Sequence, residues 1–248
     1  MPFASISPAE LGFIVSGLLA AGAVTGVLAG LFGVGGGAII VPILYETFRL
    51  LEVPEEVRMP LSVGTSLAII VPTAIRSSRA HNAKGATDRS ILDAWKVPVV
   101  LGVVLGSVIA GFADPWVFKL VLVLVSGANA TKLLSGNDAW RFASDLPRGS
   151  AMRAYGFAIG VLSSLMGIGG GALCSMVMTL HGRPIHQAVA TSAGLGVLIA
   201  VPGAIGYAIA GWGRPGLPPL SIGFVSLLGA ALLVPTSLLT TRFGVNLA

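Results

Sequence analysis

The chain has 248 residues, of which 54% are hydrophobic and only 10% charged, and its mean hydropathy is +0.90. Soluble domains carry about 25% charged residues, so this composition excludes a soluble globular domain with a water-exposed surface. The net charge of +5 lies in short loops between apolar segments, where basic residues set membrane topology rather than bind nucleic acid.

Apolar segments recur along the whole chain. Their continuous runs differ from the residue-by-residue alternation of a membrane β-barrel, so the sequence predicts an all-α polytopic membrane protein. Two of the segments, 37–50 and 171–181, are too short to cross a hydrocarbon core of about 30 Å at about 1.5 Å per residue, and are predicted to be half-helices. The predicted segments are 11–32, 37–50, 59–78, 95–112, 115–134, 151–167, 171–181, 187–210 and 219–241.

Both half-helices follow the same glycine-rich motif. Gly33-Val34-Gly35-Gly36-Gly37 recurs as Gly167-Ile168-Gly169-Gly170-Gly171, 134 positions later, and nine of thirteen positions match between 26–38 and 160–172. A glycine-broken apolar segment in corresponding places of two half-chains indicates the binding site of a transporter. The sequence therefore predicts two repeats with a site at the paired turns.

The loop charges give an orientation. Basic residues gather in 79–96 and 132–153 and more weakly in 181–184, whereas 52–56 is acidic. The positive-inside rule then places the basic loops in the cytoplasm and the N-terminus outside, and the two glycine turns enter from opposite sides. We expect inverted repeats over 1–134 and 151–248, joined by a cytoplasmic linker at 135–150. The second repeat has one segment fewer, as if a final helix were lacking.

A second duplicated patch contains hydroxyl side chains. An offset of 130 aligns Ser62-Val63-Gly64 with Ser192-Ala193-Gly194, whereas an offset of 126 aligns Thr65-Ser66 with Thr191-Ser192. The two registers differ by about one helical turn, and the sequence leaves both open.

These patterns predict an anion site built largely from backbone. A half-helix N-terminus presents unpaired N–H groups and the positive end of the helix dipole, and glycine lets a ligand approach the backbone. Two structural explanations are alternatives to this hypothesis. Small residues also allow membrane helices to pack closely, and a Ser or Thr hydroxyl often donates to a carbonyl oxygen in the preceding turn of its own helix. The candidate substrate-binding residues are Gly35, Gly36, Gly37, Gly169, Gly170, Gly171, Thr65, Ser66, Thr191 and Ser192.

Few charges lie within the apolar segments. Glu46 is one, and it is a candidate for proton coupling unless it lies at the interface beside Arg49. For Asn129, in another apolar run, we expect an interhelical hydrogen bond. The histidines fall in loops, no Cys/His set has metal-ligand spacing and no Walker lysine is present. We therefore expect no enzymatic activity, no metal and no cofactor.

The motifs resemble those of the TauE/SafE family of sulfite exporters. The resemblance covers nearly the whole chain and is carried by residues 30–38 with Val41-Pro42, by 64–67, by 166–171 and by 188–192. It implies a permease of the bacterial inner membrane that exports sulfite or small organosulfonates such as sulfoacetate. The C-terminus departs from the family pattern, in which one more apolar segment would follow.

We therefore expect a secondary transporter that exports a small sulfur oxyanion by alternating access. An inside-negative potential yields about 2.3 kcal/mol per 100 mV for each negative charge expelled, which could drive uniport. The alternatives are a proton-coupled carrier using Glu46, an anion channel, a transporter of another small anion and a membrane assembly factor without transport. The expected partners are the anion and the lipid bilayer, without nucleic acid, and a homodimer is compatible with the sequence.

Overall fold

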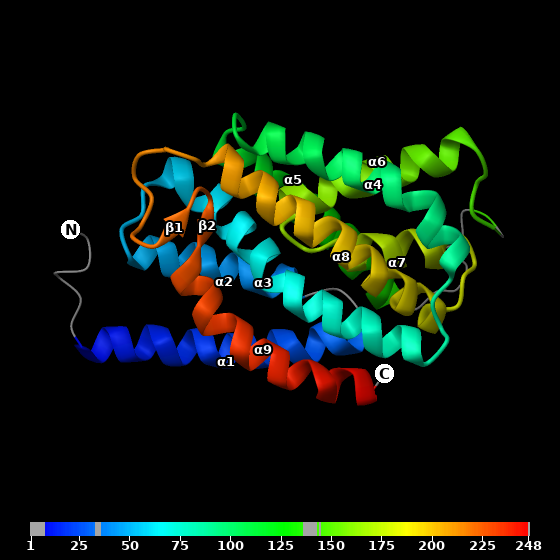
Figure 1. The fold of residues 1–248 in the computed structure, drawn as a ribbon, viewed down its shortest axis with the longest axis horizontal. Helices are drawn as coiled ribbons and strands as arrows, with labels where there is room; N and C mark the ends of the chain where they lie inside the picture. The colour runs from blue at the N-terminus through cyan, green and yellow to red at the C-terminus, as the bar shows by residue number, and fades with distance from the viewer. Residues whose placement is uncertain (1–7, 33–35, 136–142, 144, 248) are drawn as a thin grey trace.

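The computed structural model describes residues 8–32, 36–135, 143 and 145–247, and these residues form helices and one short hairpin (Figure 1). The all-α membrane fold predicted from the sequence is confirmed, and among the described helices α1, α3, α4, α8 and α9 are long and apolar enough to span a bilayer. The elements are α1 (Pro8–Phe32), α2 (Gly37–Leu50), α3 (Glu55–Ala83), α4 (Arg89–Ala110), α5 (Pro115–Ser135), α6 (Ser150–Met166), α7 (Gly171–Leu180), α8 (Ile185–Ala210), β1 (Ser221–Ile222), β2 (Val225–Ser226) and α9 (Leu227–Leu247).

The two predicted half-helices are present as α2 and α7, with 14 and 10 residues. At about 1.5 Å per residue they rise roughly 21 and 15 Å, which is less than the thickness of the hydrocarbon core. Each begins at the last glycine of its motif, Gly37 or Gly171, and each follows a glycine in the left-handed region.

The last apolar segment differs from the prediction of one helix over 219–241. Its first part is an antiparallel hairpin of β1 and β2, and α9 begins only at Leu227. The turn of the hairpin requires Gly223, whose φ is +52° and whose Cβ would lie 1.9 Å from the carbonyl oxygen of Ala208. The hydroxyl of Ser226 then accepts a hydrogen bond from Gly229 N–H and caps the start of α9.

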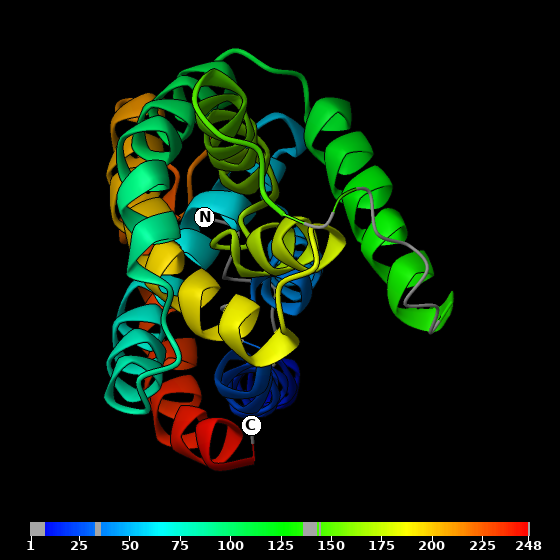
Figure 2. The same ribbon diagram turned by 90° about the vertical axis from the view of Figure 1, so that its right-hand side faces the viewer.

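Two helix pairs pack through glycine. In α1 and α9, a Cβ on Gly26 would lie 2.2 Å from the Ser237 carbonyl oxygen, and in α4 and α6 a Cβ on Gly160 would lie 2.2 Å from the Val99 carbonyl oxygen. Such close backbone approach is typical of helix association in membranes, where small residues allow van der Waals packing and the hydrophobic effect does not drive association. Figure 2 shows the α1–α9 pair at one side of the bundle and α5 at another edge.

The basic and acidic connections between helices lie at opposite ends of the molecule. The α3–α4 connection, the start of α6, the α7–α8 connection and the end of α9 gather at one end of the molecule, which we call the basic end (Figure 1). The opposite end contains the N-terminal part of α1, the hairpin and the acidic α2–α3 connection, where Lys119 pairs with Glu55 at 3.2 Å.

Large side chains hold α6 against its neighbours. Trp95 is fully buried and donates from Nε1 to the Met152 carbonyl oxygen at 2.9 Å, which joins α4 to α6. Tyr207 is also fully buried, and its hydroxyl donates to the Ser164 carbonyl oxygen at 2.9 Å, which joins α8 to α6. Both polar tips are satisfied, so the two aromatic side chains anchor α6 without an unpaired donor: Trp95 near its start and Tyr207 near the α6–α7 turn.

Candidate functional site

The residues that precede α2 and α7 have the same backbone conformation. Gly36 has φ 73° and ψ 0°, and Gly170 has φ 75° and ψ −9°. This left-handed region is open to glycine at little cost but costs other residues about 1–2 kcal/mol. The duplicated motif thus produces duplicated geometry. Gly35 lies outside the described residues.

The two turns meet in the interior. A Cβ on Gly37 would lie 2.2 Å from the Gly167 carbonyl oxygen and 2.6 Å from the Cα of Ile168. The hydroxyl of Ser66 donates to the same Gly167 carbonyl oxygen at 2.8 Å. The N-terminus of α2 therefore packs directly on the α6–α7 turn, backbone against backbone. Gly169 (φ 62°) packs on Ile70 of α3, and Gly171 is buried.

Neither half-helix has a side-chain cap. Among the described residues, no side-chain hydrogen bond caps the start of α2 or α7, in contrast to α4, where the Asp88 carboxylate accepts from two backbone N–H groups. The first N–H groups of a helix have no partner within it, and together they carry a partial positive charge. Two uncapped N-termini that converge in a protein interior form an environment suited to an anion.

A cavity of about 290 Å³ reaches both N-termini. It touches the start of α2 at Gly36 and the first turn of α7 at Ala172, and it continues along α7 to Thr179 near the basic end. Its walls are mainly apolar, as is common for sites that bind small molecules. The lining residues are Leu28, Gly36, Ala38, Ile39, Asn129, Lys132, Ala172, Ser175, Met176, Thr179, Ile185 and Val189.

Lys132 is the charged member of this lining. Its ammonium group contacts the hydroxyl of Thr179 and donates to the Met176 carbonyl oxygen at 3.3 Å, both on α7. Thr179 in turn donates to the Ser175 carbonyl oxygen at 2.9 Å. A positive charge therefore lies at the basic-end side of a cavity whose other side reaches two helix N-termini.

The four predicted hydroxyl residues are fully buried, and none lines the cavity. The Thr65 hydroxyl accepts from Ser226 N–H at 2.9 Å, and the Thr191 hydroxyl accepts from Asp88 N–H at 2.9 Å. The Ser192 hydroxyl donates within α8, to the Val189 carbonyl oxygen. Of the four, Ser66 alone hydrogen-bonds to a glycine turn within the described ranges.

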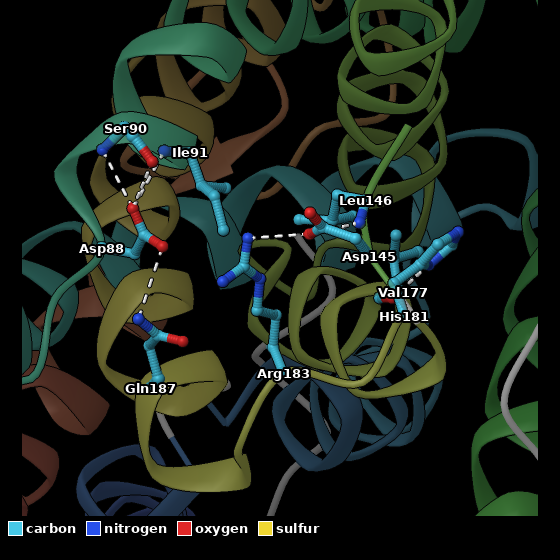
Figure 3. Close-up of polar contacts among 9 residues, drawn as sticks. All are labelled: Asp88, Ser90, Ile91, Asp145, Leu146, Val177, His181, Arg183 and Gln187. Carbon is cyan, nitrogen blue, oxygen red and sulfur yellow. Dashed lines mark hydrogen bonds and ion pairs between the residues drawn. The ribbon is translucent and has the colours of Figure 1, made fainter. Parts of the chain in front are cut away.

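Asp88, which donates to Thr191, belongs to a polar cluster at the basic end (Figure 3). Asp88 accepts from Ser90 and Ile91 N–H and receives a hydrogen bond of 3.4 Å from Gln187. Partial burial favours the protonated form of Asp88, but the hydrogen bonds from Ser90 and Ile91 outweigh it and lower the pKa of the carboxyl group.

The same view shows Arg183 beside the start of α8, with its guanidinium directed to Asp145 at 2.9 Å. His181, the residue after α7, lies with Nδ1 2.8 Å from the Val177 carbonyl oxygen and packs edge-on against Tyr155. These contacts hold the α7–α8 connection against the segment before α6. They therefore fix the end of α7, along which the cavity runs.

Glu46 lies outside this site. Its carboxylate pairs with Arg49 at 2.7 Å, both side chains are more than half exposed, and Glu46 does not line the cavity. Asn129 also differs from expectation: its amide donates to the Val125 carbonyl oxygen of its own helix, and its side chain lines the cavity.

Sequence reasoning missed two further polar groups. The loop charges place Lys132 in a basic loop, although its spacing of three from Asn129 puts both on one face of α5. Ser163 carries a buried hydroxyl without a hydrogen-bond partner in the described part of the chain, 3.1 Å from the position of a Cβ on Gly170. Nothing in the sequence distinguishes Ser163 from its neighbour Ser164.

Comparisons with known proteins give a consistent picture. The family described as "Sulfite exporter TauE/SafE" matches residues 18–248. The chain is 33% identical over 230 residues to a "Probable membrane transporter protein" of Haemophilus influenzae, with 92% of this chain and 86% of that protein covered. It is 27% identical over 237 residues to the "Probable membrane transporter protein MJ0441" of Methanocaldococcus jannaschii, with 93% and 85% covered. No solved structure matches the chain.

Proposed function

The chain belongs to the sulfite exporter TauE/SafE family and is a multi-pass membrane transporter, and we propose that it exports sulfite or a small organosulfonate such as sulfoacetate. The observation that carries this proposal is the cavity that reaches the uncapped N-termini of both α2 and α7. A small anion there would accept hydrogen bonds from backbone N–H groups at the starts of α2 and α7, where Gly36, Ala38 and Ala172 line the cavity, with Lys132 on the wall. The glycines let the two turns pack closely, because a Cβ on Gly36, Gly37 or Gly170 would meet Thr25, Gly167 or Ile199.

Magnitudes favour a small anion with few charges. Removing an ion from water costs several kcal/mol even after relaxation of the protein. A helix N-terminus returns up to about 2 kcal/mol in a partly buried geometry, and a hydrogen bond to a charged group contributes about 1.5–3 kcal/mol. Two N-termini and one ammonium group can therefore offset the dehydration of a monovalent anion such as hydrogensulfite, and part of the dehydration of a divalent one such as sulfoacetate. They are poorly matched to a large polyanion.

The packing supports inverted repeats over 1–134 and 151–248. The Thr65 hydroxyl accepts from the N–H of Ser226, which caps α9, and the Thr191 hydroxyl accepts from the N–H of Asp88, which caps α4. Because α4 and α9 are corresponding helices of the two repeats, these two contacts are equivalent. This equivalence favours the offset of 126 over 130. Glycines of α9 and α4 make a second matching pair, because Gly244 packs on Val27 and Gly106 on Val161, residues at the offset of 134.

The charge distribution supports export from the cytoplasm across the inner membrane. Basic residues at one end of the molecule favour a cytoplasmic location for that end and an external N-terminus. The cavity extends toward the basic end, which is the arrangement expected of an inward-facing carrier in an alternating-access cycle. An anion then leaves along the electric field, which supplies about 2.3 kcal/mol per charge per 100 mV. Uniport needs no coupling ion.

Replacement of Lys132 tests the cavity as the binding site. Lys132→Met keeps an apolar stem and removes the charge. We expect wild-type protein in detergent to bind sulfite or sulfoacetate in a thermal-shift titration, and the variant to bind at least about tenfold more weakly, the effect of about 1.4 kcal/mol. Lys119→Met, at the opposite end, is the control and should bind as wild type does.

Two results would contradict this account. Failure of wild-type protein to bind any anion among sulfite, sulfate, sulfoacetate, taurine and isethionate would overturn the substrate class. Unchanged affinity in a folded Lys132→Met protein would instead place the site elsewhere.

A further inference from the structure

A second pocket, lined by polar side chains, lies between α3 and α9 at the basic end. Its volume is about 550 Å³, within the usual range of about 300–1,000 Å³ for small-molecule sites. Three arginines line it, Arg76 and Arg79 from α3 and Arg242 from α9, together with Asn246. It shares no lining residue with the cavity at the glycine turns.

The arginines converge by helix geometry. Arg76 and Arg79 are three residues apart on α3, and Arg242 and Asn246 are four apart on α9, so each pair lies on one helix face. Within the part of the chain that the structure describes, none of the three guanidinium groups forms an ion pair or donates a side-chain hydrogen bond. Three like charges around one pocket repel one another, and a bound anion would relieve that repulsion.

The pocket is fixed in place by contacts that leave its arginines available. Lys84, just after α3, donates to the Val245 carbonyl oxygen of α9 at 2.8 Å. The buried Thr241 hydroxyl donates within α9 to the Ser237 carbonyl oxygen at 2.6 Å. Lys84 and Thr241 thus have partners other than the guanidinium groups.

Apolar side chains follow directly beside the pocket. Leu239, Phe243 and Leu247 recur every four residues along α9 and are each about two-thirds exposed, at 68%, 65% and 71%. This stripe is adjacent to the Arg242–Asn246 stripe on the helix surface, and α3 and α9 are both candidate membrane spans. A ligand held here by its charged group would therefore have hydrocarbon-facing surface next to it.

The geometry points to a binding site for the phosphate headgroup of an anionic phospholipid, with an acyl chain along the exposed stripe of α9. Guanidinium groups match phosphate oxygens in bidentate geometry, and basic pockets between membrane helices suit phosphodiester headgroups. The apolar stripe favours a lipid over free phosphate, because a soluble ion would make no use of it.

The test compares two triple variants with equal change of charge. One replaces Arg76, Arg79 and Arg242 by Gln, and the matched control replaces the exposed basic-end arginines Arg89, Arg148 and Arg153 by Gln. Purified full-length protein is titrated with mixed micelles that contain phosphatidylglycerol or phosphatidylcholine and, in a separate arm, with inorganic phosphate. Thermal shift and native mass spectrometry report stabilisation and bound lipid.

We expect phosphatidylglycerol to bind wild-type and control protein at least tenfold more tightly than phosphatidylcholine, and this preference to be lost in the pocket variant. The pocket variant must still bind the transported anion as wild type does, which shows that it is folded. Equal loss in both triple variants would mean attraction by net charge and would overturn the proposal. Inorganic phosphate that stabilises the wild type as well as phosphatidylglycerol does would overturn the choice of a lipid.

Discussion

At the residue scale, Gly37 lies in a helical conformation that any residue could adopt, so its lack of a side chain matters for packing. The position of its missing Cβ lies 2.2 Å from the backbone oxygen of Gly167, a distance that real Cβ atoms do not tolerate. Gly37→Ala must push the start of α2 away from the α6–α7 turn. Overpacking of this kind costs about 1–3 kcal/mol, so we expect a lower midpoint of thermal unfolding and weaker anion binding.

Gly17→Ala is the control for this prediction. Gly17 lies in α1 with nothing within 4 Å of the position that a methyl group would take, so alanine there should leave the midpoint unchanged or raise it slightly. If Gly37→Ala were as stable as Gly17→Ala, the contact between the turns would not exist in solution.

Glu46 allows a second prediction at this scale. Its carboxylate is more than half exposed and pairs with Arg49, an arrangement worth about 0–1 kcal/mol at a surface. We therefore expect Glu46→Gln to retain nearly wild-type efflux in liposomes at every pH tested. A transport rate that depends on pH in the wild type and no longer does so in the variant would favour proton coupling instead.

At the scale of elements, the cap of α4 links stability to pH. Because hydrogen bonds lower the pKa of Asp88 in the folded protein below about 3.8, its contribution to stability is present above that pH. It is lost as the pH falls through the lower folded value. We expect the unfolding midpoint of the wild type to fall below about pH 4 more steeply than that of Asp88→Asn, which retains a capping oxygen.

Asp93→Asn serves as the comparison, since Asp93 makes an exposed ion pair with Lys96 and caps no helix. Identical pH profiles for wild type and Asp88→Asn would show that the cap is not the titrating group. Asp88→Ala should lower the free energy of unfolding by about 1 kcal/mol at neutral pH, because two N–H groups at the start of α4 lose their acceptor.

The half-helices could be predicted from the sequence because their cause is local. Glycines interrupt a long apolar run at Gly33–Gly37 and Gly167–Gly171, and the following runs are too short to span. The hairpin at 221–226 could not be predicted in this way. Ile222, Phe224 and Val225 continue the apolar run, and the close packing of Gly223 on the carbonyl oxygen of Ala208 is a tertiary contact.

The site itself could be predicted only in part. The glycine turns are visible in the sequence through their duplication, but their direct contact through Gly37 and Gly167 is a tertiary fact. Thr65 and Thr191 share the duplication because they bind backbone N–H groups before α9 and α4, so a repeated motif does not by itself identify a ligand contact. Lys132 belongs to none of the duplicated motifs, so symmetry could not reveal it.

At the scale of the whole molecule, three observations belong together. Two uncapped helix N-termini converge, a cavity reaches both of them, and that cavity runs toward the end where basic residues gather. An anion carrier requires a site that is positive without being so strongly charged that the ligand cannot leave. Backbone dipoles and one ammonium group fulfil that requirement, and the family membership is consistent with it.

Counterflow in proteoliposomes tests the proposed transport most directly. Liposomes loaded with unlabelled sulfite or sulfoacetate are diluted into labelled substrate, and accumulation is followed with and without an imposed membrane potential. We predict saturable accumulation that responds to the potential, is abolished or strongly reduced by Lys132→Met, and is retained by Lys119→Met. A flux that does not saturate would indicate a channel, and no movement of any tested oxyanion by folded protein would contradict the proposed transport.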